Sequence, residues 1–202
     1  MIRANLIGDV LHLVIDRVDK ANALTQDMLC QLSMAIENSA TEAKMLVLTA
    51  EGSVFSAGAD LDDVANGDLA VSDAWEHLSQ TIVDFPGLSV AALNGTVAGG
   101  ANGMVLACDI RIAAPHAKFF YPVMKRGYLP QPSDPKRMTA LIGPARTKMI
   151  LMAGQKIDAT EALAWGLIDR IATSPLDAAL ALGDDVLNAR PDLIHGIKSL
   201  CS

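Results

Sequence analysis

Two stretches of this chain share a layout that limits the folds open to it. Residues 44–50 (KMLVLTA) and 88–95 (LSVAALNG) are almost continuous apolar runs, and each leads into a segment rich in Gly and Ala. Unbroken apolar runs are typical of strands that are buried on both faces, as in parallel sheets. Helical patterns follow, at residues 74–84 and after the Gly99–Gly100 pair. Two strand–loop–helix units in succession predict an α/β architecture.

The remaining periodicity fits the same plan. Residues 10–17 alternate between apolar and polar side chains as a strand does, and residues 110–115 and 118–122 form further short apolar runs. No low-complexity segment or long linker interrupts them. The sequence therefore predicts one α/β domain over residues 1–202, without an internal boundary.

Several residues indicate where helices begin. Thr25 precedes an amphipathic pattern and is expected to be its N-cap. Asp158, with Glu161 three residues later, forms a capping box. Asp134 is interpreted as the N-cap of another helix, and residues 174–191 are predicted to form one last amphipathic helix.

Composition and charge narrow the classes of function. Of the 202 residues, 51% are hydrophobic and 19% are charged, which suits a large core and argues against disorder. The net charge of −7 and the lack of a basic run argue against nucleic acid as a partner. An anionic small ligand stays possible, because helix N-termini and a few local cations can bind phosphate. No uncharged apolar run is long enough for a predicted membrane span.

The cysteine and histidine residues point away from disulfides and metals. Cys30, Cys108 and Cys201 are odd in number and widely spaced, with no CxxC pair, so reduced thiols in a cytoplasmic protein are expected. Cys108 lies in an apolar run and is predicted to be buried and inert. The histidines show no metal-ligand spacing, and no metal site is predicted.

The two Gly- and Ala-rich segments, FSAGADL (residues 55–61) and NGTVAGGANG (residues 94–103), carry few reactive side chains. A strand that turns into a helix through small residues presents free backbone N–H groups that a ligand can approach closely. Two such groups converging on one carbonyl oxygen would form an oxyanion hole. The alternative is that these glycines only serve tight turns or close helix packing. Neither segment is a GxGxxG fingerprint or a P-loop.

Taken together, the motifs resemble the crotonase superfamily, also called the enoyl-CoA hydratase/isomerase family. The matching stretches are DKANAL (residues 19–24), FSAGADL, NGTVAGGANGMVLACDIRIAA (residues 94–114) and GLIDRI (residues 166–171), in family order and spacing. The resemblance covers nearly the whole chain. It implies a spiral of stacked ββα units that binds an acyl-CoA thioester of the kind used in fatty acid metabolism, with no permanently bound cofactor.

The resemblance also assigns roles to residues. The backbone N–H groups of Ala59 and Gly100 would form the oxyanion hole, with Gly100 at the positive end of a helix. The DKANAL and AGADL loops would hold the adenine and pantetheine portions largely through their backbones. The positions expected to bind CoA or substrate are Ala21, Ala23, Leu24, Ala57, Gly58, Asp60, Leu61, Gly99, Gly103 and Val123.

The sequence departs from the family at the catalytic carboxylates. Hydratases carry one glutamate at the position of Gly103 and another at the position of Val123, and related isomerases carry an aspartate at the position of Gln131. Without these carboxylates, hydration by two glutamates is not available. A decarboxylase, a hydrolase or an isomerase remains open, and the alternative is a catalytically inactive acyl-CoA-binding protein. Restoring Glu at positions 103 and 123 is expected to restore some hydration of crotonyl-CoA.

Other side chains are candidates for the missing acid or base, each with a plainer reading as packing, surface or helix capping. They are Tyr121, Lys125, Tyr128, Gln131, Asp134 and His77. Family members also continue into C-terminal helices that pack between subunits. The resemblance therefore implies a homotrimer or a dimer of trimers, with trimerisation helices that are shortened or absent here.

Overall fold

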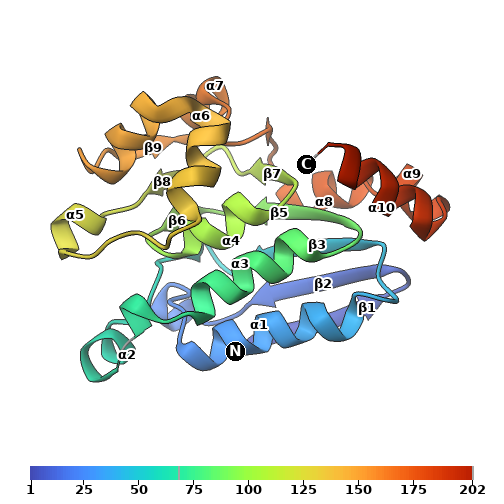
Figure 1. Cartoon of the computed structure of the whole chain (residues 1–202), viewed down its shortest axis with the longest axis horizontal. Helices are drawn as coiled ribbons and strands as arrows, with labels where there is room; N and C mark the ends of the chain where they lie inside the picture. The colour runs from blue at the N-terminus through green and yellow to red at the C-terminus, as the bar shows by residue number, and fades with distance from the viewer. Residues whose placement is uncertain (68, 202) are drawn as a thin grey trace.

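The computed structural model describes residues 1–67 and 69–201 and contains two sheets (Figure 1). In the larger sheet, β1 pairs antiparallel with β2, and every further neighbour pairs in parallel. Its strands, in spatial order, are β1 (Ile2–Ile7), β2 (Val10–Ile15), β3 (Met45–Ala50), β5 (Leu88–Leu93), β7 (Ile110–Ala113) and β10 (Arg170–Ile171).

The smaller sheet follows the larger one turn by turn. It consists, in order, of β4 (Val54–Ser56), β6 (Thr96–Ala98), β8 (Lys118–Phe120) and β9 (Ile157–Asp158), and the first three run parallel. The pairs β3–β4, β5–β6 and β7–β8 each place one strand in each sheet before the chain enters a helix. This is the predicted spiral of ββα units.

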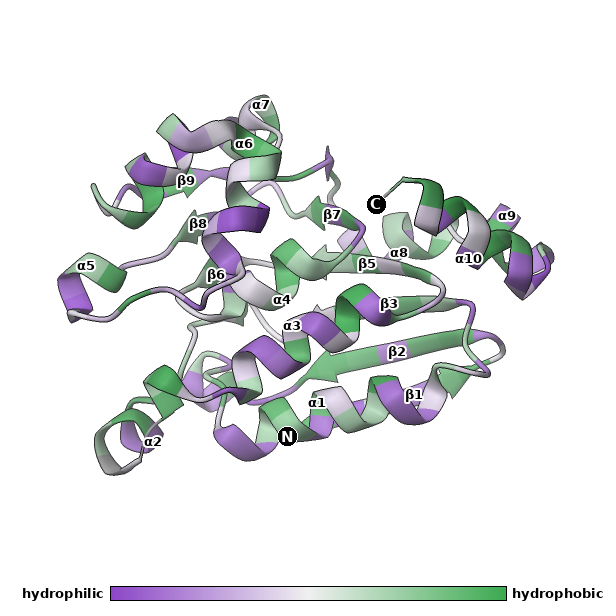
Figure 2. Cartoon of the chain, in the orientation of Figure 1, coloured by the Kyte–Doolittle hydropathy of each residue, from purple (hydrophilic) through white to green (hydrophobic). Residues whose placement is uncertain are grey.

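Helices cover the larger sheet on both faces. Helices α1 (Gln26–Ser39), α3 (Ala74–Asp84), α4 (Ala101–Ala107) and α6 (Asp134–Leu151) contact one another in that sequence, and α8 (Pro175–Ala181) packs on β3, β5 and β7 from the other face. Strand β3 shows why both faces are apolar. Leu46 and Leu48 join the main core, whereas Met45 and Val47 join the smaller core beneath α8. In Figure 2, β2 is coloured hydrophobic along most of its length, while α3 carries both hydrophobic and hydrophilic stretches.

The shorter elements lie between these helices or beyond them. They are η1 (Val18–Lys20), α2 (Leu61–Asn66), η2 (Leu69–Val71), α5 (Val123–Arg126), α7 (Ala159–Trp165), α9 (Asp184–Asn188) and α10 (Pro191–Leu200). Helix α2 and helix α5 lie at the same end of the molecule in Figure 1, beyond the ends of β6 and β8.

Two of the predicted helix starts are confirmed by their hydrogen bonds. The Thr25 hydroxyl accepts from the Met28 amide at 3.2 Å, and the Asp158 carboxylate accepts from the Glu161 amide at 2.9 Å.

Two sequence-based expectations about helices are wrong. Residues 174–191 form α8 and α9 instead of one helix, with a break at Gly183, where a Cβ atom would lie 2.8 Å from the Met45 sulfur. The chain lies close to the sheet there, and a side chain at position 183 would require the Met45 side chain to move. Asp134 is not an N-cap either: it is the first residue of α6, Ser133 precedes the helix, and the Asp134 carboxylate accepts a hydrogen bond from Tyr121 instead.

Three further findings bear on the predicted class. No helix within the described residues is long and apolar enough to cross a membrane. No cluster of three or more potential metal ligands occurs among them. All three cysteines are free, and burial raises the pKa of the Cys108 thiol to about 12, as expected for an inert buried thiol.

Candidate active site

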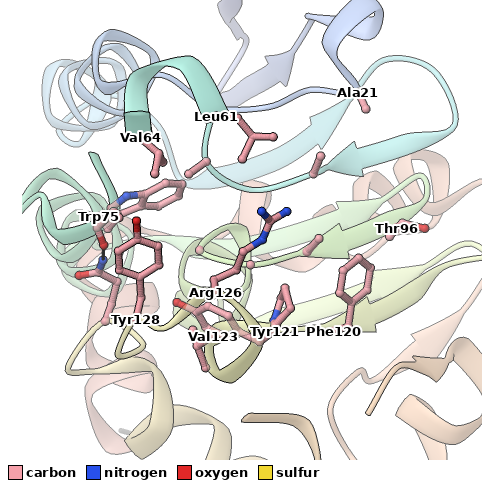
Figure 3. Close-up of a pocket in the computed structure, with 18 of the residues that line it drawn as sticks. Ala21, Leu61, Val64, Trp75, Thr96, Phe120, Tyr121, Val123, Arg126 and Tyr128 are labelled. Atoms are coloured by element: carbon pink, nitrogen blue, oxygen red, sulfur yellow. Dashed lines mark hydrogen bonds between the residues drawn. The ribbon is translucent and has the colours of Figure 1, made fainter. Parts of the chain in front are cut away.

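A cavity of about 580 Å³ lies where β4, β6 and β8 end (Figure 3). This volume is in the range of pockets that bind small molecules. One wall consists of the segments that leave the three parallel strands, from Ala57, Ala98 and Phe120 onward. The facing walls come from α2, η2 and α3 on one side and from α5 and the loop after it on the other.

The DKANAL and FSAGADL loops are joined through their backbones. The Leu24 amide donates to the Gly58 carbonyl at 2.8 Å, and the Asp60 amide donates to the Leu24 carbonyl at 2.8 Å. The Ala57 amide donates to the Ala21 carbonyl at 3.0 Å. Leu24 and Ala59 therefore form a parallel β-bridge, and the two loops act as one unit.

This bridge determines which way the Ala59 amide faces. In an extended segment, successive N–H groups point to opposite sides. Because Gly58 and Asp60 use the side toward Leu24, the Ala59 N–H points away from Leu24. Ala59 lines the cavity, and within the described residues its N–H donates to no acceptor.

Polar side chains hold the joined DKANAL and FSAGADL loops in place. The Asn22 side chain, in a left-handed turn with φ 56°, donates to the carbonyls of Glu51 and Val54. Asp60 caps α2 and pairs with Arg17 at 2.5 Å. Burial alone would raise the pKa of Asp60, but the bonds from Arg17 and from two backbone amides outweigh it and hold that pKa below its usual value.

The second loop presents another free amide. The Gly100 N–H also donates to no acceptor in the described part of the chain, and Gly100 lines the cavity. Asn102 fixes the turn, because its side-chain amide donates to the carbonyls of Gly99 (2.8 Å) and Phe120 (3.1 Å). A Cβ atom on Gly100 would lie 3.2 Å from the Trp75 ring, so the indole packs directly on this glycine.

The two loops touch each other. A Cβ atom on Gly58 would lie 2.8 Å from the Ala98 carbonyl oxygen and 3.4 Å from the Gly99 Cα atom. Gly58 also has a φ of 92°, which side chains rarely adopt. Glycine is required here for both reasons. Because Gly58 has no side chain, the two loops can approach each other, and Ala59 and Gly100 line the same cavity.

The cavity wall is mostly apolar, with a few polar groups. Among its described lining residues there is no carboxylate, histidine or cysteine, whereas Arg126 and Lys156 supply positive charge. The Lys156 ammonium lies 4.6 Å from the centre of the Phe120 ring. In Figure 3 the Arg126 side chain extends from α5 across the cavity, with Leu61 on the opposite wall. The wall also includes the side chains of Tyr121 and Tyr128.

A carboxylate does lie behind this wall, beside Gly103. A Cβ atom on Gly103 would lie 2.7 Å from Asp134 Oδ1 and 3.2 Å from Oδ2. Asp134 is fully buried and accepts a hydrogen bond from the Tyr121 hydroxyl at 2.9 Å. Burial, helped by the charge of Glu76, raises the pKa of Asp134 to about 7, although Tyr121 and Arg137 oppose the shift.

The predicted binding positions fall into two groups. Seven of them line the cavity: Ala21, Ala57, Ala59, Leu61, Gly99, Gly100 and Val123. The other five are not among the lining residues, and they are Ala23, Leu24, Gly58, Asp60 and Gly103.

The acid–base candidates also separate. His77 is exposed and pairs with Glu37 at 3.1 Å, and Lys125 is exposed outside the lining residues. Gln131 lines the cavity and donates to the Ala70 carbonyl at 3.3 Å, which is the dashed line in Figure 3. Arg126, which the sequence offers only as solvated surface or a phosphate contact, lines the cavity, whereas sequence reasoning does not identify Trp75 and Lys156, which lie outside the recognised motifs.

The ββα spiral and the ligand-sized cavity at the ends of its smaller sheet are the features expected of a crotonase-type protein. The enoyl-CoA hydratase/isomerase family matches residues 7–200, and the chain belongs to that family. A carnitinyl-CoA dehydratase of Citrobacter koseri is 31% identical in a comparison that covers 96% of this chain and 77% of that protein.

Solved structures agree with this placement. The structure of Pseudomonas aeruginosa DspI superposes on this chain with a TM-score of 0.92 and 31% sequence identity. The match covers 99% of this chain and 85% of the DspI chain. An enoyl-CoA hydratase from Bacillus anthracis has a TM-score of 0.90 and 25% identity, and covers 98% of this chain and 81% of that one.

Proposed function

We propose that the protein binds an acyl-CoA thioester in this cavity and holds the thioester oxygen between the N–H groups of Ala59 and Gly100. The observation that carries the proposal is the pair of free amides on one cavity wall, each held in place by neighbouring backbone bonds. Donors that are fixed before a ligand arrives stabilise a developing oxyanion without further reorganisation. Names of relatives, such as carnitinyl-CoA dehydratase and enoyl-CoA hydratase, point to the same class of ligand.

The positive charge of the wall supports a CoA ester in particular. The chain has a net charge of −7, yet the charged side chains that line the cavity are Arg126 and Lys156. A ligand with several phosphate charges is favoured by such a local arrangement despite the overall charge.

Enolate chemistry fits this site better than hydration by two glutamates. Gly103 and Val123 carry no ionisable group, so the usual pair of carboxylates is missing. An oxyanion hole alone lowers the barrier to any step that places negative charge on the thioester oxygen, including decarboxylation, hydrolysis and isomerisation. The second candidate is an acyl-CoA-binding protein without turnover, which the loss of both glutamates favours.

Two matched ligands test the proposal. Butyryl-CoA has the thioester oxygen, whereas S-butyl-CoA, a thioether, differs by lacking it. Calorimetric titration is expected to show that butyryl-CoA binds at least about tenfold more tightly than S-butyl-CoA, because each hydrogen bond to the thioester oxygen is worth about 0.5–1.5 kcal/mol. Equal affinity for the two ligands would remove the oxyanion role, and no binding of either would remove the assignment to acyl-CoA. Turnover of enoyl-, malonyl- and β-ketoacyl-CoAs then separates an enzyme from a binding protein.

A further inference from the structure

The missing side chain of Gly103 makes room for a carboxylate from elsewhere in the chain. Helix α6 brings Asp134 to this position, where a Cβ atom on Gly103 would be 2.7 Å from Oδ1 and 3.1 Å from the Ser79 hydroxyl. A side chain at position 103 would meet the Asp134 carboxylate, which would have to turn aside to make room for a glutamate. The carboxylate therefore stands one turn of α4 beyond Gly100, close to the proposed oxyanion hole.

A network of polar groups fixes the start of α6 and with it Asp134. The Glu76 carboxylate, on α3, accepts from both the amide and the hydroxyl of Ser133 at 2.9 Å. Arg137 donates to the Ser133 hydroxyl at 2.6 Å. These bonds anchor the residue before Asp134 to a neighbouring helix, so the carboxylate has a defined place.

Tyr121 connects this buried carboxylate to the cavity. It lines the cavity, and its hydroxyl donates to Asp134 Oδ2 at 2.9 Å. Asp134 Oδ1 is buried, and within the described residues it has no hydrogen-bond partner. A fully buried carboxylate with an unpaired oxygen destabilises the folded protein, so its presence calls for an explanation.

Resting on the proposed function, we propose that Tyr121 transfers a proton to or from the α-carbon of the bound acyl group and that Asp134 is its relay partner. In the forward direction the α C–H bond breaks and its electron pair forms the enolate. The phenol oxygen of Tyr121 takes the α-proton while its own proton passes to the Asp134 carboxylate. The reverse sequence protonates an enolate and leaves Asp134 ionised.

The electrostatics of the pair are consistent with this relay. Burial and the nearby carboxylate raise the pKa of Tyr121, so the phenol stays neutral and cannot act as a base alone. Asp134 has a pKa of about 7 and can therefore both accept and return a proton near neutral pH. The titratable groups that face Asp134 are Tyr121, Glu76 and Arg137.

The test is exchange of the α-hydrogens of butyryl-CoA in D₂O, followed by mass spectrometry. The wild-type protein is expected to catalyse the exchange, with a rate that rises with pH through about 7 as Asp134 ionises. Tyr121→Phe and Asp134→Asn are expected to lower the rate by about 10²-fold or more while butyryl-CoA binds within a few-fold of the wild-type affinity. Asp134→Asn should also abolish the rise near pH 7, which a purely structural role of Asp134 would not do.

Each outcome of this experiment has a defined meaning. Wild-type protein that binds butyryl-CoA but exchanges no α-hydrogen overturns the relay and leaves the proposed function intact. Exchange at the wild-type rate in folded Tyr121→Phe or Asp134→Asn also overturns it. Tyr128→Phe examines the other phenol of the wall: exchange lost in that variant and kept in Tyr121→Phe would move the assignment away from Tyr121. Absence of butyryl-CoA binding by the wild type rejects the proposed function itself.

Discussion

At the scale of single residues, the backbone of Gly100 carries more of the proposed function than any side chain. Its φ of −58° and ψ of −20° are accessible to other residues, so conformation does not require glycine at this position. The Trp75 ring, which would lie 3.2 Å from a Cβ atom on Gly100, sets the size limit instead. The amide N–H can therefore be removed by a substitution that suits the backbone.

We predict that Gly100→Pro weakens butyryl-CoA binding well beyond Gly100→Ala. Both variants add a Cβ atom against Trp75, and proline favours the φ found here, but only proline lacks the N–H group. Calorimetric titration should show the proline variant at least about tenfold weaker than the alanine variant, in line with the loss of a hydrogen bond to a buried oxygen. Equal affinities in two folded variants would mean that the Gly100 amide does not contact the thioester.

The raised pKa of Asp134 has a consequence for stability. The pKa in the folded state is about 7, above the usual value of an aspartate, so the folded protein binds this proton more tightly than the unfolded chain. The contribution of Asp134 to stability is then complete below about pH 4 and is lost as the pH rises through about 7.

We therefore predict that Asp134→Asn becomes progressively more stable than the wild type between about pH 4 and about pH 8. Asparagine keeps an acceptor for Tyr121 and never ionises. Urea unfolding at both pH values measures the difference, which should reach a few kcal/mol at about pH 8 and be small at about pH 4. A difference that is constant with pH would show that Asp134 has an ordinary pKa.

An expectation drawn from the sequence also depends on Asp134. The family pattern predicts that Glu at positions 103 and 123 restores hydration, but the space beside Gly103 is already filled by the Asp134 carboxylate. Two carboxylates in that space would repel and overlap. We therefore expect the restored pair of glutamates to require either a shift of the Asp134 side chain or its replacement.

At the scale of elements, the smaller sheet positions the site through one close approach. β4 and β6 run parallel, and the loops that leave them meet at Gly58, where the Ala98 carbonyl oxygen would lie 2.8 Å from a Cβ atom. Gly8 offers a matched comparison. It has a φ of 57°, and a Cβ atom added to it would meet no other atom within 4 Å among the residues that the structure describes.

We predict that Gly58→Ala destabilises the protein more than Gly8→Ala. The Gly8 variant incurs only the strain of a left-handed conformation, about 1–2 kcal/mol. The Gly58 variant adds a steric conflict with backbone, which brings the expected loss to about 2–5 kcal/mol. Chemical denaturation measures both, and similar losses for the two variants would contradict the close contact between the loops.

Local sequence patterns determine some features of this fold, whereas tertiary packing determines others. Strands such as β3 and helix starts such as Thr25 and Asp158 depend on local patterns, and they are predictable. The cavity wall contributed by Trp75, Arg126 and Lys156 depends on how segments distant in sequence pack together, which no local pattern encodes. Asp134 shows most clearly where prediction from local sequence fails. An Asp followed by Pro suggests a helix N-cap, whereas the tertiary contact with Tyr121 decides the role of Asp134.

At the scale of the whole molecule, stability is unevenly distributed. None of the residues of α10 is buried, while strands such as β3 are buried throughout. Lys198 attaches α10 to the rest of the protein, since its ammonium donates to the Gly87 carbonyl at 3.0 Å and to Asp109 at 2.9 Å. Segments with few buried contacts open locally at low free-energy cost.

We predict that limited proteolysis cleaves at α10 before any site in the sheets, and that Lys198→Ala speeds this cleavage. Loss of the two bonds from the ammonium should increase the rate of cleavage by about fivefold or more. Each bond contributes about 1 kcal/mol to the free energy that is needed to open α10. Mass spectrometry of the fragments locates the cut. A first cut within a strand of either sheet would show that α10 is bound more firmly than these contacts indicate.

The β-bridge between Leu24 and Ala59 has a mechanical consequence. Residues 21–24 cannot shift without moving the strand edge that contains the Ala59 amide, since three backbone bonds join the two loops. In the proposed function, binding of the nucleotide portion of the ligand by residues 21–24 would therefore also fix the position of the Ala59 amide at the thioester. A truncated thioester that lacks the nucleotide would lose reactivity as well as affinity, since remote attachment would tune the reacting carbonyl.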